Sequence, residues 1–540
     1  MRKFGTVRAS VALGYILAGG CGPAGAETLG AAIADAYRNN PRLQAQRAQL
    51  RVLDESVIQA GAPYRLAMNI SGNLSYTEQR QRDALDRFVS IDNKNFGIAL
   101  TASQILFNGG RTASQVSAAE ADVLAGREQL REAENQILLE VVDSYVSVRR
   151  DAELIAIQRR SVASYERQVE QARVRERGGD LTRTDIAQAE AQLQIIRTQL
   201  AQAEANLEQS RARFATVVGR NPTVLEQEPP LPGMPVSINA AYLAAETESP
   251  TLFQAILSER AGRSRVAAAR AERRPIVTAQ GSYGYVSPFS YRTRDLGRGY
   301  SGDLTLTVPL LTRGVVDSQV RQAIANRQSL TFQIEDTRRV VDQTLLNAWN
   351  QSIAARDQLA AGEAGVLAAQ AALDGVRRGF SEGFRSNFEV LDSEQRLLTA
   401  QLIVANARYN RYAGQANLLA TLGRLEAAAV QQAVAAYDAT ANLDRQRRRQ
   451  FGPFQVVLQP LDKLGHPSGR SDAAPDTARV TDSTFKPAIV PAPEGPLARG
   501  VPASGAAPGA TPPLDTRDGL TVLPPASRAA RPADAVIPNS

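Results

Sequence analysis

Histidine and cysteine, the side chains that enzymes use most often to bind metals and to catalyse, are nearly absent from this sequence. Its 540 residues include one cysteine, Cys21, and one histidine, His466. A zinc site needs several such ligands, and a nucleophilic serine or cysteine needs a histidine base. A single cysteine also rules out a disulfide within the chain. The composition therefore argues against an enzyme and predicts neither a metal ion nor a cofactor.

The charged residues near two glycine turns are the other candidates for chemistry. Glu389 and Asp392 are three residues apart, so on a helix they share one face. Two carboxylates at this spacing most often form a solvated acidic surface. Asp185 follows a glycine pair, where aspartate is a common helix N-cap. Arg385 and Phe380 flank the second turn. What these residues do depends on the elements that position them.

The N-terminus has the pattern of a secretory signal peptide over residues 1–26. A positively charged segment, 2–8, precedes an apolar run, 9–18, and small residues follow up to the expected cleavage site. The alternative is lipidation at Cys21, which ends a lipobox-like run. The small residues just after Cys21 favour ordinary cleavage. In either case we expect an exported protein.

The formal net charge of +7 belongs mostly to the two ends of the chain. The signal peptide and residues 440–540 carry most of the excess, which leaves residues 27–439 nearly neutral. Residues 440–540 are rich in proline and alanine, a composition typical of disorder. The arginine cluster at 445–449 is better interpreted as part of a flexible linker than as a site for phosphate or membrane surfaces. We therefore expect no nucleic-acid partner.

Residues 27–439 contain an internal repeat with halves 27–228 and 229–439. Gly110 aligns with Gly314, and the same separation holds without a gap for the rest of each half. Chance does not keep two sequences in register over such a length. Other pairs at this separation are Tyr145 and Trp349, Arg173 and Arg377, Asp185 and Glu389, and Glu190 and Glu394.

Each half predicts a helix, two strands and a long helical hairpin, in that order. Alternation of apolar with small or polar residues indicates the strands, and a 3.6-residue period indicates the helices. A helix as long as 111–177 implies a coiled coil or a helical tube. Tyr145 and Trp349 are expected to pack within these helices. The predicted ranges are helices 27–60, 111–177 and 238–272 and strands 67–76, 96–105, 276–286 and 301–308.

Four strands are too few to close a barrel, because about eight are needed even for one filled by side chains. An open sheet edge in lipid would leave backbone groups unpaired. If these strands lie in a membrane, several chains must share one barrel.

The sequence resembles the TolC family of outer-membrane efflux and secretion channels over residues 27–430. The resemblance rests on the strand-to-helix turn of the first half and on a set of segments in the second half. These segments are 104–110, 304–311, 318–320, 379–385, 388–392, 405–410 and 420–423.

The resemblance implies an α+β membrane protein that forms a homotrimer. Four strands from each chain would make a 12-stranded β-barrel in the outer-membrane lipid. Long helices would continue it as a tunnel in the periplasm, and the hairpin tips would close the periplasmic end. A periplasmic adaptor (membrane fusion) protein and an inner-membrane ABC or proton-driven transporter would dock there.

The resemblance also implies roles for the five charged and aromatic residues. Asp185, Phe380 and Arg385 match a network that keeps the periplasmic entrance closed. Phe380 stands where the family often has tyrosine, so a hydroxyl hydrogen bond would be missing. Glu389 and Asp392 match an acidic ring at the pore constriction, with glutamate in place of the usual aspartate at 389. Three copies would place six carboxylates around one axis.

Three functions follow from this interpretation. The chain is expected to be the outer-membrane exit duct of a tripartite export system, most directly one of type I secretion. A multidrug efflux channel driven by a proton-coupled pump would share the same structure. A protein of another class, a soluble periplasmic coiled coil, is the third alternative, and the four alternating strands argue against it.

Overall fold

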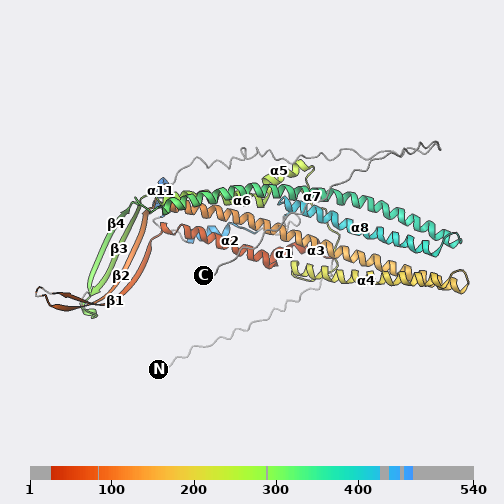
Figure 1. The fold of residues 1–540 in the computed structure, drawn as a ribbon, viewed down its shortest axis with the longest axis horizontal. Helices are drawn as coiled ribbons and strands as arrows, with labels where there is room; N and C mark the ends of the chain where they lie inside the picture. Colours follow the sequence, from red (N-terminus) through yellow and green to blue (C-terminus); the bar gives the residue numbers. More distant parts are fainter. Residues whose placement is uncertain are drawn as a thin grey trace, which may run out of the picture. The chain divides into compact units, whose positions relative to one another are not determined.

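The computed structural model describes residues 26–82, 84, 86–287, 290–425, 437–449 and 455–465. Cys21, His466 and the expected signal peptide up to residue 25 lie outside the described residues, as does the tail from residue 466. The described part consists of helices and one four-stranded sheet (Figure 1). None of the described helices has the run of apolar residues needed to cross a bilayer.

The elements follow the same order in both halves of the chain. The first half contains α1 (Leu29–Asn39), α2 (Pro41–Ala60), the 3-10 turn η1 (Ala62–Tyr64), β1 (Ala67–Arg82), β2 (Phe88–Phe107), α3 (Arg111–Arg177) and α4 (Arg183–Val218). The second contains α5 (Ile238–Glu248), α6 (Pro250–Ala271), β3 (Ile276–Ser287), η2 (Thr293–Asp295), β4 (Gly297–Thr307), α7 (Val315–Ser381) and α8 (Asn387–Thr421). The helices α10 (Ala441–Arg449) and α11 (Gln455–Gly465) follow.

The first helix expected in each half is in fact two helices. Proline lacks the N–H that a helix interior needs but fits the first helical turn. The chain therefore breaks at Asn40, whose carboxamide oxygen accepts hydrogen bonds from the N–H groups of Arg42 and Leu43. It breaks again at Ser249, before Pro250.

The long helices have the predicted bounds. α3 covers Arg111–Arg177 and ends at Gly178, and α4 ends at Gly219, whose φ of +92° lies in the left-handed region. The two strand-to-helix turns are also alike, because the residue before each helix is a glycine with positive φ, Gly110 or Gly314.

The strands form one antiparallel sheet in the order β1-β2-β3-β4. The hairpin of β1 and β2 is longer than expected, because pairing continues from Thr77 opposite Asn93 to Arg82 opposite Phe88. The polar residues there predict a loop, but they lie on an exposed ladder. Glu78 accepts a hydrogen bond of 2.6 Å from the hydroxyl of Ser90 on the facing strand.

The two faces of the sheet differ in chemistry. Residues directly opposite on neighbouring strands project from the same face. One row across the four strands consists of Ile70, Leu100, Tyr283 and Tyr300, and the adjacent row on the other face of Ser71, Ala99, Gly284 and Gly299. Ile70 is 77% exposed and Tyr300 is 82% exposed. One face is thus apolar and uncovered, and the other carries small and polar side chains.

The outer edges of the sheet have no strand partner within the described residues. β1 pairs only with β2, and β4 only with β3. Both edges therefore present free backbone groups to a neighbour.

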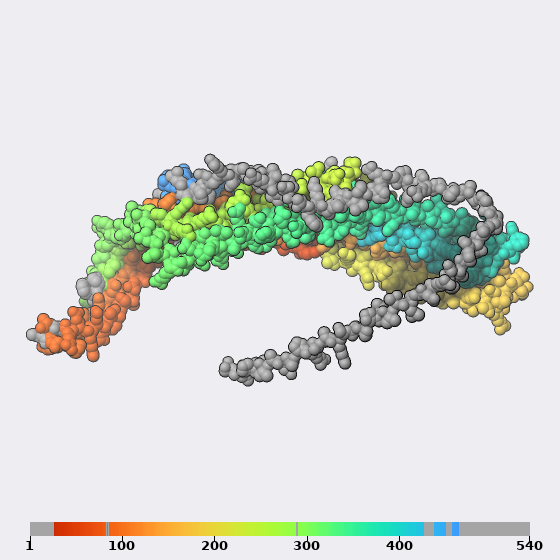
Figure 2. All heavy atoms as spheres, turned by 45° about the horizontal axis from the view of Figure 1, so that its top comes forward, coloured from red at the N-terminus to blue at the C-terminus, as the bar shows by residue number. Residues whose placement is uncertain are grey.

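The two longest helices differ in how much of their surface is covered. α3 packs along α4, α6 and α8, and its residues Leu138, Val141 and Tyr145 are buried in the largest hydrophobic core. α7 has few buried residues, and its Phe332 and Leu367 are about three-quarters exposed. Figure 2 shows α7 in green as a broad exposed surface of the helical part. A face of this kind is suited to packing against another copy.

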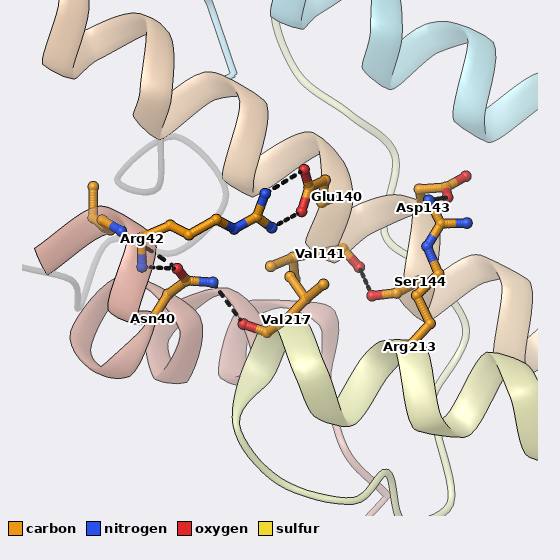
Figure 3. A network of polar contacts seen from close by, with 9 residues as sticks. Asn40, Arg42, Glu140, Val141, Asp143, Ser144, Arg213 and Val217 are labelled. Carbon is orange, nitrogen blue, oxygen red and sulfur yellow. Dashed lines mark hydrogen bonds and ion pairs between the residues drawn. The ribbon is translucent and has the colours of Figure 1, made fainter. Parts of the chain in front are cut away.

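Polar contacts tie α2, α3 and α4 together at the level of Asn40 (Figure 3). The carboxamide nitrogen of Asn40 donates a 2.9 Å hydrogen bond to the carbonyl oxygen of Val217 at the end of α4. Arg42 pairs with Glu140 of α3, and Arg213 of α4 pairs with Asp143 of α3 at 3.3 Å. These contacts hold the short helices α1 and α2 beside the hairpin.

The C-terminal segment corrects the expectation of disorder from residue 440. α10 inserts Leu443 into the main core, and Asn442 donates a 2.8 Å hydrogen bond to Asp54 of α2. α11 contacts α3, β2 and η1. These helices form because their apolar and polar residues find partners in the body, which composition alone does not reveal.

Asp462 of α11 is a buried cap for the first long helix. Its carboxylate accepts hydrogen bonds from the backbone N–H groups of Gly110 at 2.9 Å and Ala113 at 3.1 Å, and from the Tyr64 hydroxyl at 3.0 Å. The side chain is 1% exposed. The negative charge of Asp462 also interacts favourably with the positive, N-terminal end of the α3 dipole.

Replacing Asp462 with alanine is expected to destabilise the start of α3. The buried N–H donors would lose their acceptor, a loss of about 2 kcal/mol, or roughly thirtyfold faster local amide exchange. Hydrogen exchange over residues 108–116 measures this. Lys463→Ala, on the exposed side of the same helix, is the control, and equal protection in both variants would contradict the assigned role.

Candidate functional site at the hairpin tips

The tips of the two helical hairpins have the same local construction. Gly179 and Gly383 both have φ of +83°, which glycine adopts without strain. The second helix of each hairpin then starts at a hydroxyl N-cap, Thr182 or Ser386, which accepts a 3.3 Å hydrogen bond from the N–H three residues on. The repeat therefore places Asp185 and Glu389 at equivalent positions.

Asp185 completes a capping box at the first tip. Its carboxylate accepts from the backbone N–H of Thr182 at 2.9 Å and from the Thr182 hydroxyl at 2.7 Å. These two hydrogen bonds, the backbone one first, lower the pKa of Asp185. The carboxylate thus stabilises the start of α4.

Glu389 makes a different contact at the second tip. Its carboxylate forms an ion pair with Arg385 at 3.5 Å, four residues earlier and largely exposed. Asp392, one turn further along α8, pairs with Arg396 at 2.8 Å. Glu389 therefore pairs with an arginine in the turn before α8, and Asp392 with an arginine on α8 itself. Exposed pairs of this kind are weak, and the side chains of Glu389 and Asp392 are 42% and 41% exposed.

Phe380 links the two hairpins. The guanidinium of Arg175, near the end of α3, lies 4.2 Å from the centre of the Phe380 ring. Its Nη1 also lies 3.5 Å from the Phe380 carbonyl oxygen. Phenylalanine at this position thus provides a cation–π contact where a tyrosine would add a hydroxyl.

The predicted site residues occupy two separate groups in one chain. Arg385 and Glu389 are in contact, and Asp392 follows on the same helix. Asp185 lies on the other hairpin, and no hydrogen bond or ion pair joins it to Arg385 in the part of the chain that the structure describes. A network that includes both would have to form between copies or in another arrangement of the tips.

Glu394, the repeat partner of Glu190, accepts hydrogen bonds from three side chains near the tips. Its carboxylate oxygen accepts hydrogen bonds from Arg377 of α7 at 2.7 Å and from Gln168 and Ser164 of α3 at 3.0 and 3.1 Å. The residue is 5% exposed. It joins α3, α7 and α8 through one charge.

The repeat itself carried the signal for this contact. Glu190 pairs with Arg173 in the first hairpin at 2.7 Å, as Glu394 pairs with Arg377 in the second. The first pair is exposed and the second is covered by α3. An arginine and a glutamate retained in both halves predict an ion pair across each hairpin, but not which pair is buried.

An apolar cluster supports the polar contacts. The hydroxyl of Tyr165, which is 1% exposed, donates a 3.2 Å hydrogen bond to the carbonyl oxygen of Leu391. Burial, and then the nearby charge of Glu394, raise the pKa of Tyr165. The cluster also contains Ile157, Val169, Ala189, Leu193, Ile196, Leu398 and Ala405.

The described residues contain no group of histidine, cysteine, aspartate and glutamate that could hold a metal ion. What they contain is a duplicated framework of long helices, a sheet with one apolar face and charged helix tips. This combination defines a class of export channels of the bacterial outer membrane.

Comparison with known proteins identifies the family. The profile of the family described as outer membrane efflux protein matches residues 32–220 and 241–424. The chain therefore belongs to this family, and the two matched ranges are its two structural repeats. The resemblance to TolC channels and the α+β fold are confirmed.

Curated relatives support the same conclusion. The outer membrane efflux protein BepC of Brucella suis is 30% identical over 79% of this chain and 92% of its own length. The outer membrane protein TolC of Escherichia coli is 26% identical over 77% and 86%. The alkaline protease secretion protein AprF of Pseudomonas aeruginosa is 23% identical over 65% and 74%.

A solved structure shares the fold. The outer membrane protein VceC of Vibrio cholerae superposes with a TM-score of 0.64, over 73% of this chain and 96% of that one, at 19% identity. Membership of the outer membrane efflux protein family, together with the curated relatives, shows that the protein is a non-enzymatic outer-membrane channel that extends into the periplasm. Membership of this family removes the alternative of a soluble periplasmic coiled coil.

Replacing Glu394 with alanine is expected to loosen the contact between the hairpins. Arg377, Gln168 and Ser164 would lose a shared acceptor, at a loss of about 1–3 kcal/mol. The measurement is amide exchange in α3 around residues 164–168. The matched control is Glu190→Ala, which removes the exposed equivalent and should change stability by less than about 1 kcal/mol. A similar effect of both variants would contradict a special role for Glu394.

Proposed function

We propose that this channel is the exit duct of a type I secretion system and works as a homotrimer. The trimeric duct in this proposal rests on the sheet, which has one apolar face and two free edges. The apolar face suits lipid, and the face with small and polar side chains suits a water-filled interior.

The sheet topology supports closure by copies of the same chain. β1 begins, and β4 ends, at the side of the sheet where the long helices start. The β4 edge of one chain can therefore meet the β1 edge of the next in antiparallel pairing, as all other pairs in the sheet do. Three copies give the 12-stranded barrel and leave no free edge.

Two observations favour secretion of a protein. The relative AprF is named for protease secretion, and the N-terminus has the pattern of ordinary signal cleavage rather than lipidation. The second candidate is drug efflux, which the name of BepC favours. The partners would be an ABC transporter in the first case and a proton-driven pump in the second, each with a periplasmic adaptor.

The hairpin tips are proposed as the docking and gating end. Phe384 and Phe388 are 80% and 62% exposed at the second tip and offer apolar contacts to an adaptor. Asp185, Phe380 and Arg385 are proposed to hold the tips closed in the trimer. Glu389 and Asp392 are proposed to form the acidic ring at the constriction.

Deletion of the gene in its host distinguishes the two functions. If the duct serves type I secretion, one or more proteins disappear from the medium while resistance to small toxic compounds changes little. Mass spectrometry of the medium and growth inhibition assays measure these outcomes. The intact gene, supplied on a plasmid, should restore secretion. Unchanged secretion with a large rise in drug sensitivity would favour efflux and contradict the proposal.

The acidic ring predicts a selectivity that can be recorded in planar bilayers. Glu389→Ala combined with Asp392→Ala should reduce the preference for cations severalfold, because six carboxylates leave the constriction. Arg396→Ala should increase the preference, because it removes the cation that pairs with Asp392.

Gating is read from the same recordings. Arg385→Ala should raise the open fraction of the channel, and Arg378→Ala, an exposed arginine of the same tip, is the control. Selectivity that stays unchanged in the double variant would exclude the ring, and no rise in leak in Arg385→Ala would exclude its part in closure.

A further inference from the structure

The helix α11 has an apolar side that faces away from the protein. Leu458 and Asp462, one helical turn apart, are buried against the body. Val456 and Val457 are about 60% exposed and Leu461 is 45% exposed. A helix with buried anchors on one side and exposed aliphatic residues on the other is an amphipathic element with one apolar surface still uncovered.

The contacts of α11 place it at the end of the apolar face of the sheet. Gln104 lies on the apolar face of the sheet, in the row of Ala279 and Leu304. Its carboxamide donates a 3.0 Å hydrogen bond to the carbonyl oxygen of Pro63 in η1, and η1 contacts α11. The helix therefore lies where the apolar face of the sheet ends and the long helices begin.

Positive charge precedes α11 along the chain. Arg445, Arg448 and Arg449 are exposed on α10, and Arg447 pairs with Glu120 in the first turns of α3. Glu120 lies near the start of α3, so the arginines are close to the level of α11. Exposed arginines beside an apolar helix match the phosphates of a membrane surface, because the chains enter the lipid and the charges stay with the headgroups.

We propose that α11 is an interfacial helix that lies in the periplasmic leaflet of the outer membrane, with the α10 arginines on anionic phospholipid headgroups. This inference rests on the proposed placement of the sheet in the membrane. Lipid is the occupant because the exposed side of α11 continues the apolar face of the sheet and positive charge flanks it. A second copy would meet the sheet at its β1 and β4 edges instead.

The role goes beyond support of the fold. Asp462 fixes α11 to the start of α3 and to Tyr64, so contact with lipid holds the strand-to-helix junction at the membrane surface. The C-terminal segment thus sets the depth of the channel in the membrane.

The test places a fluorescent probe on α11 in the full channel. Val457→Cys is labelled with an environment-sensitive dye after reconstitution into vesicles that contain phosphatidylglycerol. Lipids with a spin label near the headgroup should quench it severalfold. Leu304→Cys, on the apolar face of the sheet, is the positive control, and Leu367→Cys, exposed on α7, is the negative control. Cys21, the one native cysteine, is expected to leave with the signal peptide.

The outcomes separate the two proposals. Quenching at 304 and 457 but not at 367 supports both. Quenching at 304 alone overturns the role of α11 and leaves the membrane sheet standing. Lack of quenching at 304 overturns the proposed function itself. Replacing Arg445, Arg448 and Arg449 with glutamine should reduce the quenching at 457 in anionic vesicles more than in neutral ones. An equal change in both would exclude the headgroup contact.

Discussion

The free backbone groups along the outer edges of β1 and β4 constrain the described structure more than any other feature. Each unpaired N–H or C=O group in lipid costs several kcal/mol, so an isolated sheet of this kind is not stable in a membrane. The other features follow from the same requirement. The apolar residues Ile70 and Tyr300 remain uncovered on one face, and α7 leaves Phe332 and Leu367 exposed. A single chain therefore forms only part of a closed barrel. Its sheet edges are paired, and its exposed apolar residues on α7 are covered, only when other copies are present.

The two repeats use one framework for different contacts. Asp185 and Glu389 occupy the same position after a hydroxyl cap, yet the first caps its own helix and the second pairs with Arg385. Glu190 stays exposed, whereas Glu394 is buried among three helices. The difference arises because α3 of the first hairpin packs against α8 of the second and covers Glu394, whereas Glu190 on α4 stays exposed. The two hairpins are thus similar in sequence and backbone, but their side chains make different contacts because the helices around them differ.

The sequence predicted the elements well wherever the pattern was local. The period of 3.6 residues and the glycines at 178 and 219 define α3 and α4, and alternation locates the four strands. The prediction failed where contacts between residues far apart in the sequence determine the local structure. The polar residues 77–82 extend β1 because β2 lies beside them, and 455–465 form a helix because Asp462 reaches Gly110. For the site, the repeat placed Asp185 and Glu389 correctly on the tips, but burial of Glu394 depends on α3 and has no signature within its own segment.

The cap provided by Asp462 has a consequence for how the chain matures. The acceptor lies 352 residues after the Gly110 donor that it satisfies. A chain that emerges from its N-terminus first must therefore leave the N–H groups of Gly110 and Ala113 without this acceptor until almost all of the body has been delivered. Contacts of such high sequence separation form late and slow folding. The junction between the sheet and α3 is therefore complete only after the whole body has been exported. In a chain truncated before α11, the start of α3 would stay locally unstable and accessible to periplasmic proteases.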